Sequence, residues 1–197
     1  LGSFETNEDY MPYVHSILNG AVENTISGYL NVSVLGGNTA NTEFEFLTGN
    51  TMAFLPQGSV AYQQYLKRQM PSLASHLRDL GYLTIATHPY NSTGWDRNKV
   101  YPLLGFDEMY FIKDYKNPER VRKYVSDKAC YDKIIGMYES KPADTPLFVF
   151  NVTMQNHSSY TDDFDNFHPD IEVSGSKSKA LNNYLSLMKI SDKSVQE

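Results

Sequence analysis

The chain alternates between two hydrophobic periodicities. Segments rich in β-branched and aromatic residues predict strands at 25–35, 82–87, 107–112 and 147–153. Apolar residues at helical spacing predict a short helix entered at Pro12 and capped by Asp9, then helices within 40–49 (ending at Gly49), 59–80 (broken at Pro71), 95–103, 118–139 and 181–195. The polar stretch 160–179 is expected to be a loop. Strands that alternate with helices indicate an α/β fold with a largely parallel sheet.

Length and composition fit one domain that spans residues 1–197. Of the 197 residues 41% are hydrophobic, which is enough to bury a core, and the net charge of −6 argues against a nucleic-acid binder. A single cysteine excludes an internal disulfide framework, and no apolar run approaches the ~18–20 residues of a membrane span. The chain opens in a predicted loop and stops inside a predicted helix. We therefore expect it to be a piece of a longer protein.

Three polar clusters follow the ends of predicted strands. They are GGNTANTE at 36–43, HPYNSTGWDR at 88–97 and the segment around His157 at 156–160. Ligands of parallel α/β sheets bind beyond the carboxyl ends of the strands. Three clusters at equivalent positions therefore predict one shared site.

Each cluster has a functional and a structural interpretation. Thr39 starts a helix behind two glycines, where its hydroxyl could attack phosphorus or ligate a metal, or simply cap the helix. Arg97 suits phosphate and Trp95 suits a sugar or glycerol, although Trp95 could instead fill the core and Arg97 lie on a solvated helix start. His157 could hold a phosphate oxygen, or it could be a satisfied structural histidine.

The ordered set of motifs resembles a known family. GGNTANTEFEFLTG followed by FLPQGS, then HPYNSTGWDR, then the strand that runs into QNHSSY resemble the extracellular domain of lipoteichoic acid synthase and related phosphoglycerol transferases. These are sulfatase-like members of the alkaline phosphatase superfamily, and the likeness covers essentially the whole chain. It implies a three-layer α/β/α sandwich with a mostly parallel sheet, incomplete at both ends in this chain.

The resemblance also implies a mechanism. Thr39 would attack a phospholipid such as phosphatidylglycerol, form a glycerophosphoryl-threonine intermediate and ligate a divalent metal, Mn²⁺ or alternatively Mg²⁺. The implied substrate-binding residues are His88, Trp95, Arg97 and His157. The implied partners are a phospholipid head group and a glycerol-phosphate acceptor, without nucleic acid. The implied location is the extracellular face of a Gram-positive cell membrane, with the anchor outside this chain.

Some features of the family are missing from these 197 residues. The family takes a metal-binding carboxylate from upstream and an Asp-His pair from downstream, and no Asp-His dipeptide occurs here. Thr39 is therefore the one metal ligand expected, and the isolated chain should bind metal poorly and be inactive. The Cys/Ser-x-Pro-x-Arg motif of formylglycine sulfatases is also missing. The open alternatives are a phosphoethanolamine transferase, a phosphodiesterase or sulfatase-like hydrolase on the same fold, and a non-catalytic module that binds glycerol-phosphate polymers or cell-wall glycan.

Overall fold

The computed structural model describes residues 5–197. Its elements, in chain order, are α1 (Pro12–Leu18), α2 (Thr39–Thr48), η1 (Met52–Phe54), α3 (Ala61–Gln64), α4 (Leu73–Asp79), β1 (Leu83–His88), η2 (Gly94–Asp96), α5 (Arg97–Leu103), β2 (Glu108–Phe111), η3 (Ile112–Asp114), β3 (Arg120–Val121), β4 (Tyr124–Val125), α6 (Asp127–Ser140), β5 (Leu147–Asn151) and α7 (Lys179–Gln196). They form two compact units, each described by itself. The sheet unit comprises 29–116 and 134–152, and the hairpin unit comprises the chain up to Gly28 together with 117–133 and 153–197.

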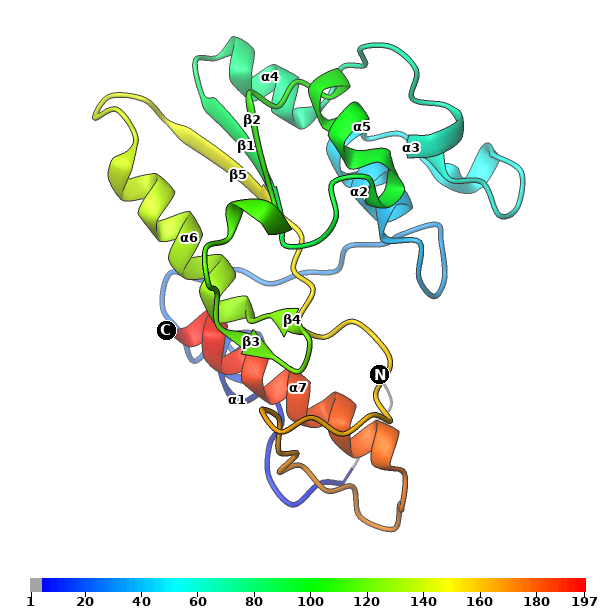
Figure 1. Cartoon of the computed structure of the whole chain (residues 1–197), viewed down its shortest axis with the longest axis vertical. Coiled ribbons are helices and arrows are strands. Elements are labelled where there is room, and N and C mark those ends of the chain that lie inside the picture. Colours follow the sequence, from blue (N-terminus) through cyan, green and yellow to red (C-terminus); the bar gives the residue numbers. More distant parts are fainter. Residues whose placement is uncertain (1–4) are drawn as a thin grey trace. The chain divides into compact units, whose positions relative to one another are not determined.

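The sheet unit is built on three parallel strands in the order β2-β1-β5 (Figure 1). Ile85 of the central strand β1 pairs with Glu108 of β2 on one side and with Val149 of β5 on the other. The α/β class with a parallel sheet is thus confirmed. The last strand was expected to be buried, yet β5 is half-buried along its whole length because, in the described part of the chain, it pairs on one side only.

Helices α2, α4 and α5 contribute to one hydrophobic core with the sheet. Helix α2 buries Phe44 and Leu47, which follow Ala40 at helical spacing. Tyr101 of α5 stacks on Phe111 of β2, with ring centroids 6.3 Å apart. Helices α4 and α5 confirm that helices precede and follow the central strand along the chain. Helix α2 ends as expected, because Gly49 adopts the left-handed conformation with φ 69°.

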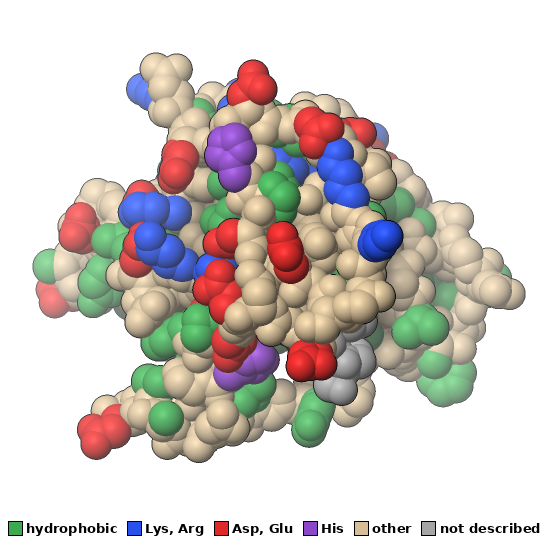
Figure 2. Space-filling view, turned by 90° about the horizontal axis from the view of Figure 1, so that it is seen from below, with side chains coloured by type: hydrophobic (Ala, Val, Ile, Leu, Met, Phe, Trp, Pro, Cys, Tyr) green, Lys and Arg blue, Asp and Glu red, His purple; other side chains and the backbone are tan. Residues whose placement is uncertain are grey.

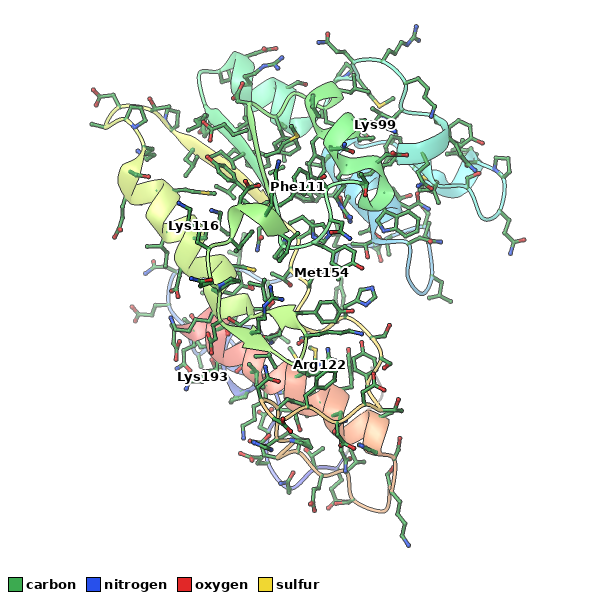
Figure 3. The ribbon with its side chains drawn as sticks, in the orientation of Figure 1. Lys99, Phe111, Lys116, Arg122, Met154 and Lys193 are labelled. Atoms are coloured by element: carbon green, nitrogen blue, oxygen red, sulfur yellow. The ribbon has the colours of Figure 1, made fainter. Side chains whose placement is uncertain are left out.

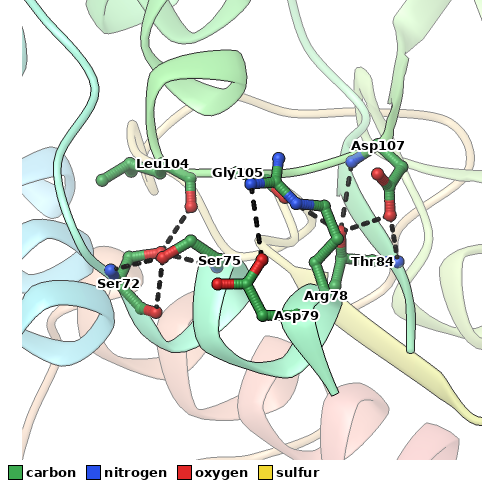
Figure 4. Close-up of polar contacts among 8 residues, drawn as sticks. All are labelled: Ser72, Ser75, Arg78, Asp79, Thr84, Leu104, Gly105 and Asp107. Carbon is green, nitrogen blue, oxygen red and sulfur yellow. Dashed lines mark hydrogen bonds and ion pairs between the residues drawn. The ribbon is translucent and has the colours of Figure 1, made fainter. Parts of the chain in front are cut away.

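The start of α4 is joined to the turn before β2 (Figure 4). The Ser72 hydroxyl accepts from the N–H of Ser75 and donates to the carbonyl of Leu104, so the helix cap also anchors the turn. Gly105 in that turn has φ 92°, and a Cβ on it would lie 2.7 Å from the Cα of Ser75. The close approach requires glycine at this position.

The hairpin unit combines two helices with a short β-ribbon. Strands β3 and β4 pair in antiparallel orientation across a two-residue turn. The carboxylate of Asp192 on α7 accepts from the N–H groups of Tyr13 and Val14, at 2.9 and 2.8 Å, and so satisfies the first turn of α1. The prediction that Asp9 caps α1 is wrong, because the N-cap residue is Met11 and Asp9 accepts only from the N–H of Met11 itself, at 2.8 Å. Helix α7 confirms the helix expected at 181–195.

Three secondary-structure predictions are wrong. The first half of the helix pair expected at 59–80 is helical only over Ala61–Gln64. Residues 25–35 form no strand, and Ile26, Tyr29 and Leu35 are almost fully exposed. Their β-branched and aromatic side chains favour a strand only beside a partner strand, which the described residues do not provide. The helix expected at 118–139 begins only at Asp127, because the β3–β4 hairpin occupies the first part.

The surface carries both signs of charge. Figure 2 shows Asp and Glu side chains (red) interspersed with Lys and Arg (blue) over the face that it draws. Among residues 5–197, no helix combines the length and the apolar character needed to cross a bilayer.

Candidate active site

Thr39 opens α2 at the end of a left-handed turn. Gly36, Gly37 and Asn38 have φ values of 68°, 94° and 52°, which glycine adopts freely and asparagine tolerates. The turn leaves Thr39 exposed at the helix N-terminus, where the first N–H groups and the helix dipole attract an anion. The interpretation of Thr39 as a mere cap is wrong, because the N-cap residue is Asn38 and it makes no side-chain capping bond.

One turn further along α2, Glu43 forms a buried ion pair with Arg97 of α5. Arg97 donates from Nε to Oε2 at 3.2 Å and from Nη2 to Oε1, and both side chains are 3% exposed. Tyr101 donates to the same carboxylate at 3.0 Å. The ion pair therefore connects the helix that carries Thr39 to the end of the HPYNSTGWDR segment.

The arginine and the two tyrosines around this carboxylate have shifted pKa values. Burial alone would lower the pKa of Arg97, but the hydrogen bonds and the charge of Glu43 raise it above its ordinary value. Burial, reinforced by the charge of Glu43, raises the pKa of Tyr101 and Tyr62 well above the usual range, so both phenols stay protonated. Arg97 also donates from Nη1 to the carbonyl of Gly94 at 3.3 Å. A contact between Arg97 and substrate remains a prediction.

Trp95 and Asp96 form a kink before α5. Their φ values are 55° and 57°, a left-handed conformation that costs on the order of 1–2 kcal/mol per non-glycine residue. Trp95 packs partly against the core of the sheet unit, and Asp96 pairs with Lys99 at 2.8 Å. Trp95 is therefore a core residue in part, while its exposed portion remains available to a ligand.

His88 ends β1, beside the point where the chain leaves β5. Its Nδ1 lies 2.8 Å from the carbonyl oxygen of Val152, and the residue is buried. A carbonyl accepts only, so this contact places the ring proton on Nδ1 and orients the imidazole. The residue lies at the carboxyl end of the central strand, the end at which parallel sheets bind ligands.

His157 belongs to the hairpin unit. Its side chain is exposed, and its Nδ1 lies 3.1 Å from the carbonyl oxygen of Ser158, so the interpretation as a satisfied structural histidine stays open beside the functional one. The ring centroid lies 5.7 Å from that of Tyr124, and Nδ1 is 3.4 Å from the Tyr124 hydroxyl. Its own carbonyl accepts from Arg122 at 2.7 Å. The other four predicted site residues lie in the sheet unit.

Two residues escaped the sequence analysis. Glu43 interrupts the apolar stripe of α2, and an acid on a buried helix face needs a partner. Its position in the sequence therefore already indicates a buried ion pair or hydrogen bond. Arg122 carries no such indication in the sequence. Its contact with the carbonyl of His157 depends on the turn between β3 and β4, which the local sequence does not predict.

The described residues do not form a complete metal site by themselves. Within residues 5–197, no three His, Cys, Asp or Glu side chains group so as to hold a metal ion. The one ligand expected in this chain, Thr39, supplies a hydroxyl oxygen.

Comparison with solved structures agrees with this architecture. The crystal structure of the lipoteichoic acid synthase LtaP from Listeria monocytogenes matches 99% of this chain and 47% of its own, with a TM-score of 0.79 and 21% identity. The phosphoglycerol transferase GacH from Streptococcus pyogenes, in complex with sn-glycerol-1-phosphate, matches 98% of this chain and 50% of its own, with a TM-score of 0.77 and 27% identity. The chain thus spans about half the length of these neighbours.

Curated relatives are longer still. A putative cyclic beta-1,2-glucan modification protein of Rhizobium meliloti is 40% identical over 125 residues, which are 64% of this chain and 19% of that protein. The capsular polysaccharide biosynthesis protein RkpI of the same organism is 30% identical over 136 residues, 64% of this chain and 24% of its own. The sulfatase family model matches residues 7–197. Because that match covers nearly the whole chain, the chain belongs to the sulfatase family.

Proposed function

We propose that this chain carries the nucleophile and part of the substrate site of an enzyme that transfers glycerol phosphate from a phospholipid such as phosphatidylglycerol. The observation that carries the proposal is the exposed Thr39 at the left-handed turn into α2. The buried Glu43–Arg97 pair supports it, because it connects this helix to the Trp95 segment. Family membership and the likeness to GacH, a phosphoglycerol transferase, support the same reaction class.

The reaction proceeds in two displacements at phosphorus. The Thr39 oxygen attacks the phosphodiester, a Thr39 O–P bond forms, and the P–O bond to diacylglycerol breaks. The proton lost by the hydroxyl is balanced by the proton gained by the diacylglycerol oxygen. An acceptor hydroxyl then attacks the same phosphorus, the Thr39 O–P bond breaks, and the proton lost by the acceptor returns to the Thr39 oxygen.

Four further side chains hold the substrate in this proposal. His157 binds a phosphate or glycerol oxygen, and Trp95, Arg97 and His88 line the glycerol phosphate pocket. A bound divalent metal, Mn²⁺ or Mg²⁺, would lower the pKa of the threonine hydroxyl and neutralise charge at phosphorus. Thr39 is the ligand that this chain would contribute.

Beside the glycerol-phosphate acceptor that the resemblance implies, we propose a hydroxyl of an envelope glycan as acceptor, outside the bacterial membrane. Two relatives are named for glucan modification and capsular polysaccharide biosynthesis. A glycan supplies the uncharged hydroxyl that the second displacement requires.

The test uses the full-length protein, incubated with phosphatidylglycerol and Mn²⁺ and then quenched for peptide mapping by mass spectrometry. We expect a glycerophosphoryl group on Thr39 that is absent in Thr39→Ala. Thr42→Ala is the matched control, because Thr42 lies one turn along the same helix, and this variant should retain the adduct.

Other outcomes separate the alternatives. An adduct that forms only with phosphatidylethanolamine would replace the proposal with a phosphoethanolamine transferase. Release of glycerol phosphate into water without acceptor labelling would indicate a hydrolase. A folded, metal-loaded protein that forms no adduct and turns over no phospholipid, but binds glycan, would be a binding module.

A further inference from the structure

Arg122 occupies an unusual position for an arginine. It is the first residue of the two-residue turn between β3 and β4, and its φ is 56°, a conformation that asparagine or glycine adopts at lower cost. Arginine in a surface turn is normally solvated, yet Arg122 is only 5% exposed. Its side chain is therefore directed inward from a turn that does not favour it.

The guanidinium holds the segment that follows β5. It donates to the carbonyls of Gln155, His157 and Ser159, at 2.8, 2.7 and 2.5 Å. These are alternate residues, so one planar cation binds three carbonyl groups of a single five-residue segment. Figure 3 labels Arg122 at the β3–β4 turn, next to this segment. An ammonium group lacks the planar fork that reaches three carbonyls in fixed directions.

Two tyrosines complete the environment of the cation. The guanidinium carbon lies 5.8 Å from the ring centroid of Tyr124 and 5.6 Å from that of Tyr160, within cation–π range. Tyr160 also donates to the carbonyl of Asn156 at 2.8 Å. Both rings limit the orientations open to the guanidinium.

His157 lies at the centre of the held segment. Its backbone is fixed by Arg122, while its ring stays exposed beside the hydroxyl of Tyr124. An exposed side chain on a rigidly held backbone is what a ligand-binding histidine needs, because less conformational freedom is lost on binding.

We propose that Arg122 is a positioning residue that acts on substrate binding through His157. The step from ordered segment to substrate affinity rests on the proposed function, in which His157 binds a phosphate or glycerol oxygen. The ordering of 155–159 by Arg122 stands independently of that function.

The experiment titrates the full-length protein with sn-glycerol-1-phosphate and follows the His157 ring by NMR. Arg122→Lys should weaken binding at least tenfold, to about the affinity of His157→Ala. The double variant Arg122→Lys/His157→Ala should bind no more weakly than His157→Ala alone. Arg120→Lys is the matched control: this exposed arginine of the same hairpin donates only to Lys123 among the described residues, and its change should leave affinity unaltered.

Unchanged affinity in Arg122→Lys, or additive losses in the double variant, would overturn the proposal. If His157→Ala itself binds normally, the assignment of His157 fails. Hydrogen exchange at 155–159 then tests Arg122 separately, with at least tenfold faster exchange expected in Arg122→Lys. Should Arg122→Lys not fold, Asn166→Ala serves instead, because the Asn166 amide holds the Arg122 carbonyl at 3.0 Å. Its loss should also be non-additive with His157→Ala, and additivity would refute the proposal.

Discussion

The Glu43–Arg97 ion pair makes a sharp prediction about stability. Glu43→Gln keeps the shape of the side chain but removes its charge, which leaves the guanidinium of Arg97 buried without a counterion. Loss of one partner from a buried pair costs about 3–5 kcal/mol. The glutamine oxygen can still accept one hydrogen bond, and Gly94 still accepts from Arg97. We therefore expect about 3 kcal/mol, the lower end of that range.

Urea denaturation of the chain measures this effect, with the fluorescence of Trp95 as the signal. Trp95 is the only tryptophan and lies two residues from Arg97, so it reports on this part of the fold. With an m value of about 2 kcal/mol per molar urea, a loss of about 3 kcal/mol lowers the midpoint by about 1.5 M. Asp132→Asn is the control, because the Lys128–Asp132 pair is exposed and its loss should leave the midpoint essentially unchanged.

A double-mutant cycle distinguishes the pair from simple packing. Arg97→Met alone leaves the carboxylate of Glu43 buried without a counterion. The double variant Glu43→Gln/Arg97→Met has no buried charge at this pair. The double variant should be more stable than the sum of the single losses predicts, by at least about 2 kcal/mol. A loss below about 1 kcal/mol in Glu43→Gln, or additive losses in the cycle, would refute this account of the ion pair.

Two further predictions concern local features of the fold. Gly105→Ala should lower the free energy of unfolding, measured by urea denaturation, by about 3 kcal/mol, because the new Cβ would overlap Ser75 at a positive φ. Gly136→Ala, in open space on α6, should raise it by about 0.8 kcal/mol. Equal effects of the two substitutions would contradict this reasoning. Burial raises the pKa of Asp127 in the folded state, so its proton is held more tightly there and its contribution to stability falls as pH rises from the ordinary value of 3.8 through the raised one. Asp127→Asn should therefore gain stability relative to the parent chain over that window, and a constant difference across pH would contradict it.

The sequence predicts those elements whose signal is local. The strand 82–87 precedes a polar cluster and lies between two helical patterns, and the structure has β1 at Leu83–His88. Gly49 ends α2 by its backbone preference alone, as predicted. The predicted break at Pro71 is not what separates the two helices, because α3 already ends at Gln64. The parallel direction of the three paired strands follows from the alternation of helices and strands, which requires crossover connections, whereas their order β2-β1-β5 was not predicted.

The misses have one physical cause, which is dependence on distant partners. Residues 25–35 have strand composition but no neighbour to pair with in the described part of the chain. The hairpin 120–125 lies within a stretch of residues that are compatible with a helix. Its turn is stabilised by a distant residue, Asn166, which donates to the carbonyls of Arg120 and Arg122. The local pattern of side chains indicates neither the missing partner strand nor the contact with Asn166.

The candidate site divides in the same way. Thr39 and His88 were found because glycine turns and strand ends mark them locally. The partnership of Glu43 with Arg97 spans more than fifty residues and needed the structure. Arg97 is recognisable as an anion-binding type of residue, but its sequence neighbourhood does not reveal that a buried glutamate faces its guanidinium.

That glutamate explains how the strained segment beside it persists. Trp95 and Asp96 together cost about 2–4 kcal/mol in their left-handed conformations. Removal of one partner from the adjoining ion pair leaves a buried charge without a counterion and costs about 3–5 kcal/mol, which is comparable with the strain of the kink. Weakening the pair should therefore release Trp95 before the sheet unit unfolds. A native-state change in Trp95 fluorescence in Glu43→Gln, without urea, is the consequence, and an unchanged spectrum would mean that core packing alone maintains the kink.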